Sequence, residues 1–443
     1  MKKRALGLVL SFCLVFSAVP FIAACTSSKG NSQASYDNGK VYFLCNKPEQ
    51  IKQWEALAQL YTSQTGTPVT VFNASSGQYD VTLKSEMAKT NAPTMFQVNG
   101  PVGFSNWKRF CYDLTNTDVA KQITSEEYVL KDGDQIKGLA YAVETYGIMV
   151  NKKLLEKAGY QVSDINNFYD LAYIAQDIQS RKDQLGFVAF TSMGMDPSSS
   201  WRVTAHLANM PIYYEYKQDG IDSTDAIKGT YLPQFKQIFD LYLNNSTCLP
   251  TEISSKTADD ATAEFMTDKA VFYQNGSWGY AKVAEKGDDN LAVIPLYIGA
   301  DGEENQGLAT GSENFWVVNS NSSPKDIDAT LKFMYWLVTD PVAIKAIGGT
   351  TGAMPDGSIG MGNVMPFKQA IKPDNIFFRT ADALEAQGKD NVKWCFSTIP
   401  SELWKTNLRS AMVTYASTES ENGWANVVEK FVDGWATEAA SSR

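Results

Sequence analysis

The stretch VYFLCNKPEQIKQWEALAQLYTSQTGTPVTVFN, residues 41–73, has the pattern of a strand, a helix and a second strand. It opens on the apolar run Val41–Leu44, which is typical of a buried strand. Apolar side chains then recur at helical spacing over residues 50–62, and Pro68 precedes a second apolar run. A helix over 80–89 and a strand over 94–98 are expected next. The order βαβαβ favours an α/β lobe with a parallel sheet at its centre.

The alternation continues along the chain. Asn151 is expected to cap a helix that ends at Gly159, and Pro233 falls in the first turn of another. Further strands are expected at 146–150, 186–190, 270–273, 291–296 and 315–318. Further helices are expected at 167–178, 232–243, 326–338, 401–415 and 427–439.

Composition excludes several classes of function. The 443 residues are 44% hydrophobic and 20% charged, an ordinary globular composition with a length suited to two or three domains. The single histidine, His206, excludes a histidine-cluster metal site and leaves one candidate base for nucleophilic catalysis. A core or surface histidine is the favoured interpretation. The net charge of −10 argues against nucleic acid as a partner.

The N-terminus predicts a targeting segment. Three basic residues at positions 2–4 precede the short apolar run Ala5–Val19, the arrangement of a secretory signal peptide. The run Ile22-Ala23-Ala24-Cys25 resembles a bacterial lipoprotein box, in which the cysteine becomes lipidated. The alternative is a plain signal peptide with an accidental cysteine. Residues 26–39 are polar and suit a flexible tether. We therefore expect a protein anchored by lipid to the extracytoplasmic face of the cell membrane.

Removal of residues 1–25 changes the charge and the cysteine count. It leaves 36 basic and 49 acidic residues, a net charge of −13. The spacing of the remaining cysteines matches no zinc site, and zero, one or two disulfides are all compatible with it. These cysteines are Cys45, Cys111, Cys248 and Cys395.

Polar residues follow the first strands, where ligands of open α/β sheets lie. Asn46, Lys47 and Glu49 follow the first strand, Gly77-Gln78-Tyr79 precedes the second helix, and Asn99-Gly100 follows the third strand. For each group, a capped turn without function is the alternative.

Four ordered stretches resemble the extracellular solute-binding proteins of carbohydrate ABC transporters, the superfamily of the maltose-binding protein. They are LAYAVETYGIMVNKKLLEKAG (139–159), FMTDKAVFYQNGSW (265–278), GSENFWVV (311–318) and Ile399-Pro400 with Trp404. The resemblance covers residues 41 to about 440. It departs from the family at Asp268, where glycine is usual, and at Gln97-Val98-Asn99, which puts the sugar contacts of the first lobe in doubt.

The resemblance implies an α/β clamp of two lobes, each a mainly parallel sheet flanked by helices. Lobe 1 would comprise residues 40–143 and 315–350, and lobe 2 residues 147–309 and 355–443. Three hinge crossovers would fall at Ala142–Gly147, Ala309–Asn314 and Gly348–Pro355. Glycines suit the third because they absorb large backbone rotations.

The resemblance also implies sugar-binding residues. Aromatic rings cover the C–H faces of a sugar, while carboxylates and amides bond its hydroxyls. Trp278 and Trp404 match stacking positions, and Trp201 lies where the second lobe offers another ring. Glu144 and Glu313 lie at two crossovers.

Packing in the core is the alternative for each tryptophan. Trp54, Trp316, Trp336 and Trp435 are assigned to the core, and Trp107 is undecided. The predicted substrate-binding set is Asn46, Tyr79, Asn99, Glu144, Asp196, Trp201, Trp278, Glu313 and Trp404.

Two classes of function stay open at this point. The first is a binding protein that captures an oligosaccharide, or a non-sugar solute such as a peptide or polyamine, and delivers it to permease subunits. The second is an extracellular glycoside hydrolase, for which Glu144 and Asp196 are the nominal carboxylate pair. We favour the non-enzymatic binding protein and expect no cofactor, no metal, a monomer and no nucleic-acid partner.

Overall fold

The computed structural model describes residues 38–74 and 78–441 of the chain. The predicted signal peptide, the lipidated Cys25 and the tether up to residue 37 therefore lie outside the described residues, as does Gly77. The strands are β1 Val41–Cys45, β2 Val69–Asn73, β3 Met95–Asn99, β4 Val129–Asp132, β5 Gln135–Ala140, β6 Glu144–Asn151, β7 Val188–Phe190, β8 Ala270–Gly276, β9 Leu291–Ile294, β10 Gln306–Gly311, β11 Asn314–Val318 and β12 Asp390–Lys393.

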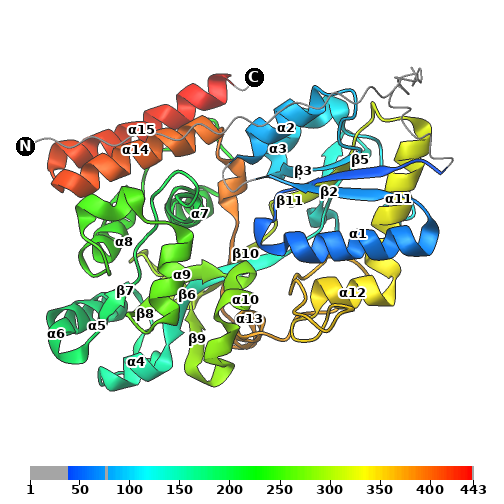
Figure 1. Cartoon of the computed structure of the whole chain (residues 1–443). Coiled ribbons are helices and arrows are strands. Elements are labelled where there is room, and N and C mark those ends of the chain that lie inside the picture. The colour runs from blue at the N-terminus through cyan, green and yellow to red at the C-terminus, as the bar shows by residue number, and fades with distance from the viewer. Residues whose placement is uncertain (1–37, 75–77, 442–443) are drawn as a thin grey trace, which may run out of the picture. The chain divides into compact units, whose positions relative to one another are not determined.

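Helices flank these strands (Figure 1). They are α1 Ile51–Thr65, α2 Tyr79–Met87, α3 Gly100–Trp107, α4 Lys152–Lys157, α5 Phe168–Ser180, α6 Lys182–Leu185, α7 Asn209–Asp219, α8 Leu232–Asn244, α9 Ala258–Met266, α10 Tyr280–Val283, α11 Pro324–Thr339, α12 Pro341–Gly348, α13 Ile376–Ala386, α14 Glu402–Thr418 and α15 Glu421–Ser441. A π-helix spans Arg202–Leu207, and short 3-10 turns include η1 Pro48–Gln50, η8 Ser277–Gly279 and η12 Cys395–Thr398.

The predicted α/β fold is confirmed, with two separate sheets. The first sheet has the order β2-β1-β3-β11-β5-β4, and the second has the order β12-β10-β6-β8-β7 with β9 paired to β6. The predicted βαβαβ opening is β1-α1-β2-α2-β3, and β1 runs parallel to both β2 and β3. We call the part of the chain around the first sheet lobe 1 and the part around the second sheet lobe 2.

The expectation of mainly parallel sheets is wrong, because both sheets are mixed. Strand β11 runs antiparallel to β3, with Asn314 opposite Asn99, and β6 runs antiparallel to β8, β9 and β10. The reason is the path of the chain. Strand β11 starts beside the C-terminal end of β3, so it must run in the opposite direction. Strand β6 likewise starts where β10 ends.

Two of the three crossovers lie where the sequence places them. The chain leaves the first sheet after Ala140 and enters the second at Glu144, and it returns between Gly311 and Asn314. The third lies later than the predicted Gly348–Pro355. Met354, Met361, Met365 and Phe367 pack in the core of lobe 1, and helix α13 is the next element on the second sheet.

Close packing explains the glycines at the predicted third hinge. A Cβ atom on Gly348 would lie 2.5 Å from a side-chain carbon of Ile371, and one on Gly349 would lie 2.5 Å from the carbonyl oxygen of Lys345. The absent side chains therefore let backbone segments approach.

The core of lobe 1 forms on both faces of its sheet. Helices α1 and α11 bury Trp54, Leu57 and Phe333 against one face, while Leu83 of α2 and Phe104 of α3 pack on the other. Trp54, Trp316 and Trp435 are core residues, as predicted, and Trp336 is partly buried with its N–H donating to Gln64.

The structure resolves whether the cysteines of the described chain form disulfides. Cys45, Cys111, Cys248 and Cys395 are buried free thiols in the described chain. Burial raises the pKa of the thiols of Cys45, Cys111 and Cys395 to about 12, so these thiols stay protonated at neutral pH.

Within residues 38–74 and 78–441, none of the helices combines the length and apolar character that a membrane crossing requires.

Candidate functional site

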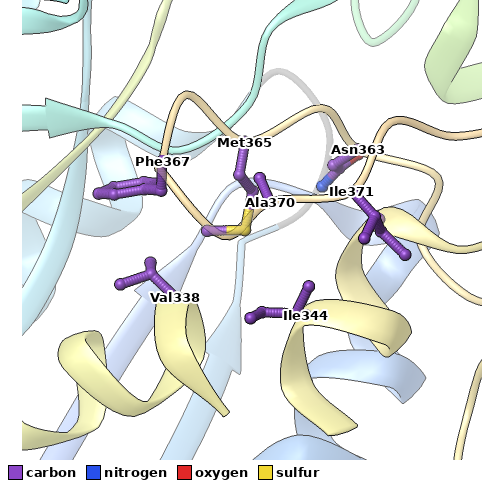
Figure 2. Close-up of a pocket in the computed structure, with 8 residues that line it drawn as sticks. Val338, Ile344, Asn363, Met365, Phe367, Ala370 and Ile371 are labelled. Carbon is purple, nitrogen blue, oxygen red and sulfur yellow. The ribbon is translucent and has the colours of Figure 1, made fainter. Parts of the chain in front are cut away.

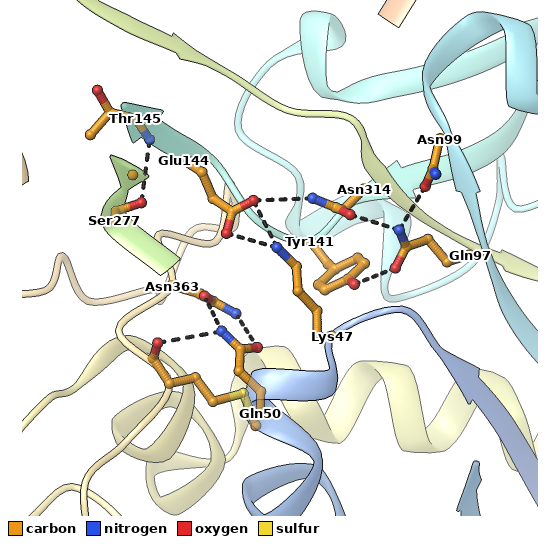
Figure 3. Close-up of polar contacts among 12 residues, drawn as sticks. Lys47, Gln50, Gln97, Asn99, Tyr141, Glu144, Thr145, Ser277, Asn314 and Asn363 are labelled. Carbon is orange, nitrogen blue, oxygen red and sulfur yellow. Dashed lines mark hydrogen bonds and ion pairs between the residues drawn. The ribbon is translucent and has the colours of Figure 1, made fainter. Parts of the chain in front are cut away.

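A charged cluster lies where the chain first crosses between the sheets (Figure 3). The Nζ atom of Lys47, just after β1, donates to both carboxylate oxygens of Glu144, at 2.7 and 2.8 Å. Both side chains are buried. We call Lys47, Glu49, Glu144 and Glu313 the charged cluster, since Glu49 and Glu313 act electrostatically on Lys47. The cluster brings the ends of β1 and β10 to the start of β6.

The pKa values of the cluster reflect burial and mutual charge. Burial alone would lower the pKa of Lys47, but Glu144 and then Glu49 raise it above its usual value. Desolvation raises the pKa of Glu49, opposed by Lys47, although Glu49 is exposed.

The carboxylate of Glu313 has no bonded partner in the described chain. It makes no hydrogen bond or ion pair with any described residue, and desolvation raises its pKa to about 7, opposed by Lys405 and Lys47. A carboxyl group with this pKa changes charge near neutral pH. It can accept hydrogen bonds when ionised and donate one when protonated.

An amide relay continues from Glu144 into lobe 1. Asn314 donates to Glu144 at 3.2 Å, and Gln97 donates to Asn314 at 2.6 Å and to Asn99 at 2.7 Å. The hydroxyl of Tyr141 donates to Gln97 at 2.5 Å. Gln97 lies within β3, and its partners Asn99, Tyr141 and Asn314 occupy a strand end or a crossover, so the relay ties the two crossing chains to the first sheet (Figure 3).

An aromatic cluster lies in lobe 2, and we define it as Tyr146, Trp201, His206, Trp278 and Trp394. The rings of Trp201 and Trp278 are 5.9 Å apart, and His206 lies 5.0 Å from each. His206 stacks on Tyr146 at 4.5 Å. Tyr146, His206 and Trp394 are buried, whereas Trp201 and Trp278 are partly exposed. Two indole rings therefore remain partly open to solvent.

Glycine makes room for Trp278. A Cβ atom on Gly276, the last residue of β8, would lie 2.2 Å from the indole ring. Only glycine lets that ring lie over the strand end. The order Asn275-Gly276-Ser277-Trp278 is therefore a local requirement of the ring position.

Strand β6 links the two clusters. Glu144 and Tyr146 are two residues apart on this strand, so their side chains lie on the same face. Between them, the backbone N–H of Thr145 donates to the hydroxyl of Ser277, beside Trp278, at 3.3 Å. The charged cluster and the aromatic cluster are thus neighbours, and together they offer hydrogen-bonding groups beside partly open rings.

His206 is a packing residue, as the sequence favoured. Burial, followed by the charges of Lys405 and Lys47, lowers the pKa of the imidazole to about 3. The ring is therefore neutral at physiological pH. It contributes a flat surface to the aromatic cluster and is a poor general base.

Two of the cavities lined by described residues are small. One lies in lobe 1 under the segment 363–371 and is lined mainly by apolar side chains, including Val338, Ile344 and Met365 (Figure 2). Its volume is about 10 Å³, room for about one water molecule and far below a sugar ring. No group of three or more potential metal ligands occurs among the described residues.

Comparison with known proteins identifies the chain. The family described as bacterial extracellular solute-binding protein matches residues 56–355. The chain belongs to this family. A solute-binding protein is a receptor rather than an enzyme, so the expectation of a non-enzymatic function is confirmed. No curated protein sequence matches the chain significantly.

Solved structures of solute-binding proteins share the fold. The SBP RafE in complex with raffinose has a TM-score of 0.68 at 15% identity, covering 90% of this chain and 99% of its own. A chitin oligosaccharide binding protein has a TM-score of 0.69 at 15% identity with the same coverage. Maltose-bound MalE3 of T. maritima has a TM-score of 0.63 at 15% identity, covering 88% and 98%. The two-lobe architecture is therefore shared across nearly the whole described chain.

The structure removes two residues from the predicted binding set of this solute-binding protein. Trp404 has 0% of its surface exposed, contacts Phe431 and Trp435, and donates its indole N–H to the carbonyl oxygen of Phe431. Its prediction as a stacking residue is wrong, because no face is open. Tyr79 is also buried, and its hydroxyl bridges backbone groups of Leu44 and Gln97.

Asp196 holds a turn of the chain, and its role as a ligand contact stays a prediction. Its carboxylate accepts from the backbone N–H and hydroxyl of Ser198, at 3.0 and 2.6 Å. These bonds form the turn that precedes Trp201. Glu144 is bonded to Lys47, so the two carboxylates named for the hydrolase alternative have separate structural partners.

The remaining predicted residues lie in or beside the two clusters. Glu144 and Glu313 belong to the charged cluster, and Trp201 and Trp278 to the aromatic cluster. Asn99 belongs to the relay, and Asn46 adjoins Lys47 and is partly exposed. Their role in binding stays a prediction.

Sequence reasoning missed Asn314, Trp394 and Lys405. Lys405 influences Glu313, Asp80 and His206 electrostatically, which places it near both clusters. One signal was available. Lys405 directly follows the predicted residue Trp404 on α14, so it could have been considered together with that residue. Asn314 could have been inferred from its place at the second crossover.

Asp268 stands where the family usually has glycine, and the structure gives a local explanation. Its backbone has a φ of 60°, the left-handed conformation that glycine adopts readily. The carboxylate pairs with Lys286 and accepts from Asn151. The aspartate therefore keeps the glycine conformation and adds a link to the start of α4.

Proposed function

We propose that this solute-binding protein captures an oligosaccharide between its two lobes and delivers it to the permease of an ABC importer. The observation that carries the proposal is the pair of partly exposed rings, Trp201 and Trp278, beside the charged cluster. Such rings cover the C–H faces of a sugar, and the carboxylates of Glu144 and Glu313 accept from its hydroxyls. The ligands of the neighbours, raffinose, chitin oligosaccharide and maltose, support the same class.

Lobe closure would signal that the ligand is bound. A ligand that contacts both lobes favours the closed state by its additional contacts there. The crossovers at residues 141–143 and 312–313 carry or adjoin the charged cluster, so a bound hydroxyl at Glu313 would act where the chain bends.

The decisive experiment is calorimetry of the mature protein against raffinose, maltose, chitin oligosaccharides and xylan oligosaccharides, with Trp278→Ala as the test variant. We expect one class of sugar to bind the parent. The variant should bind it at least tenfold more weakly, about 1.4 kcal/mol, because a stacking face is removed.

Trp107→Ala is the matched control, since Trp107 is also partly exposed but packs on Phe96 and Phe110 in lobe 1. It should bind like the parent. Equal binding by the parent and Trp278→Ala would refute the assigned site. If no sugar of the panel gave binding heat or a change in tryptophan fluorescence, the assignment of a sugar as the ligand would be refuted.

A polyamine is the second candidate solute. Glu49, Glu144 and Glu313 gather around one lysine, and Glu313 is unpaired. Spermidine, putrescine and a short peptide series therefore belong in the same panel. Binding of a polyamine that Glu313→Gln weakens would replace the sugar by a cationic ligand at the same site.

We further propose that Cys25 is lipidated and tethers the protein to the extracytoplasmic face of the membrane. The support is the Ile22-Ala23-Ala24-Cys25 sequence after a basic and apolar start. In the native cell, Cys25→Ser should release the protein into the medium. Full retention of that variant with the membrane fraction would contradict the anchor.

A further inference from the structure

A second cavity lies in lobe 2, beneath the segment that follows Trp201. It has a volume of about 20 Å³, and its polar lining includes Ser192, Arg202, Tyr242 and Gln274. Since a cavity of about 10–15 Å³ holds one water molecule, one small occupant fits. A sugar or a polyatomic anion such as sulfate does not.

Arg202 is buried there without a matching negative charge. Only 3% of its surface is exposed. Its Nη2 atom donates to the carbonyl oxygen of Met193 at 2.5 Å, and its guanidinium lies 5.6 Å from the ring centre of Tyr273. Its Nε–H is buried and has no hydrogen-bond partner among the described residues. An unfilled donor on a buried cation is costly.

The carboxylates that act electrostatically on Arg202 do not pair with it. No carboxylate oxygen of the described chain lies within 4.0 Å of a guanidinium nitrogen of Arg202, the distance limit for an ion pair. Glu264 pairs with Lys256 at 3.8 Å and accepts from the backbone N–H of Ser192 at 2.7 Å. Asp196 accepts from the backbone N–H and the hydroxyl of Ser198, and its hydrogen bonds keep the pKa of its carboxyl below the usual value despite desolvation. Glu264 and Asp196 therefore attract Arg202 only at longer range, without bonding to it.

Two hydroxyl groups share the cavity with Arg202. Ser192 and Tyr242 are 1% and 3% exposed, and neither hydroxyl has a hydrogen-bond partner among the described residues. The cavity therefore offers two O–H donors and one charged N–H donor. A water molecule would accept from some of these donors but would bring no negative charge. An anion accepts from all three and neutralises Arg202.

We propose that this cavity is a binding site for a small monovalent anion of the size of chloride, held by Arg202, Ser192 and Tyr242. The site is separate from the proposed sugar site. Arg202 begins the π-helix that carries His206 and directly follows Trp201. An anion bound there fastens the segment that presents both rings to the aromatic cluster.

Two measurements on the mature protein test the proposal. Crystals grown without chloride and soaked in bromide should show an anomalous peak in the cavity, within hydrogen-bond reach of Arg202 Nε, Ser192 Oγ and Tyr242 OH. In solution, chloride titrated against gluconate at constant ionic strength should raise the melting temperature to a plateau.

The variants separate the site from general salt effects. Arg202→Gln should abolish the saturable rise. Because that variant has a buried substitution and is at risk of misfolding, Ser192→Ala and Tyr242→Phe serve as second tests. Each should raise the half-saturating chloride concentration at least fivefold. The exposed Arg379, which pairs with Asp288 and Asp374, provides the control Arg379→Gln, which should respond like the parent.

Two results would overturn the anion site. One is a bromide soak with only water density in the cavity. The other is an equal chloride response in the parent, Ser192→Ala and Tyr242→Phe. Neither result bears on sugar binding, which calorimetry measures independently.

Discussion

The charged cluster and the aromatic cluster meet at the start of β6 but satisfy their groups in different ways. In the charged cluster, Lys47 and Glu144 bond each other, and the amide relay occupies Glu144 further. In the aromatic cluster, rings pack against rings, and Trp201 and Trp278 keep part of their surface open. Breaking the Lys47–Glu144 pair should therefore damage the fold first, whereas disturbing an open ring should damage binding first.

The largest expected effect tests the first half of this contrast. Lys47→Met leaves the buried carboxylate of Glu144 with Asn314 as its remaining bonded partner. Breaking one side of a buried ion pair costs about 3–5 kcal/mol, so the free energy of unfolding should fall by that amount. Urea denaturation measures it.

Two controls make this result specific. Lys121→Met breaks the exposed pair with Asp118, whose side chains are 61% and 74% exposed, and should cost less than about 1 kcal/mol. The double variant Lys47→Met/Glu144→Gln removes both charges and should recover most of the loss. Equal effects of Lys47→Met and Lys121→Met would mean that the buried pair is not a stabilising unit.

A smaller effect concerns the unpaired member of the charged cluster. Desolvation raises the pKa of Glu313 from 4.5 to about 7 in the folded protein. The folded state therefore binds the proton more tightly than the unfolded state. The resulting stabilisation is complete below pH 4.5 and is lost as the pH rises through about 7. From the difference in pKa, and allowing for partial exposure, the loss is about 2–3 kcal/mol.

Glu313→Gln should remove this pH dependence. At pH 8 the variant should be more stable than the parent, and below pH 4.5 the two should have similar stability. Urea denaturation at several pH values measures the difference, and groups common to both proteins cancel. A difference between variant and parent that stays constant from pH 4 to pH 8 would contradict the raised pKa.

The sequence predicted the parts of this fold that depend on local patterns. Alternating apolar runs and caps located β1, β2, β3 and β6, and Asn151 caps α4 through its bond to the Leu154 N–H. Sheet direction escaped prediction, because β11 and β6 arrive from the other lobe, and no local pattern encodes that path. The third crossover escaped because Gly348 and Gly349 permit close packing, which has the same sequence signature as a hinge.

The tryptophans show the same limit within the candidate site. Trp278 and Trp404 both follow short polar turns and both match family positions. Trp278 lies over Gly276 and is partly exposed, whereas α15 covers Trp404 through Phe431 and Trp435. The covering helix is about 30 residues further along the chain. Ring exposure is decided by such distant segments, so residue type and spacing alone do not predict it.

The smallest expected effect on stability tests the second half of the contrast. In Gly276→Ala, the new methyl group would lie 2.2 Å from the Trp278 ring, so the ring must move. Since Trp278 is partly exposed, it has room to shift, and the cost should lie near the lower end of overpacking, about 1 kcal/mol. Binding of the sugar should fall by at least tenfold, close to the effect of Trp278→Ala.

Gly103→Ala is the control, because its new methyl group would meet neighbours at an ordinary 3.6 Å. Gly103 lies inside α3, where alanine is the better helix former, so that variant should keep full affinity and gain slightly in stability. If Gly276→Ala bound sugar like the parent, the position of the Trp278 ring would have no part in recognition, and the aromatic cluster would be a second packing core.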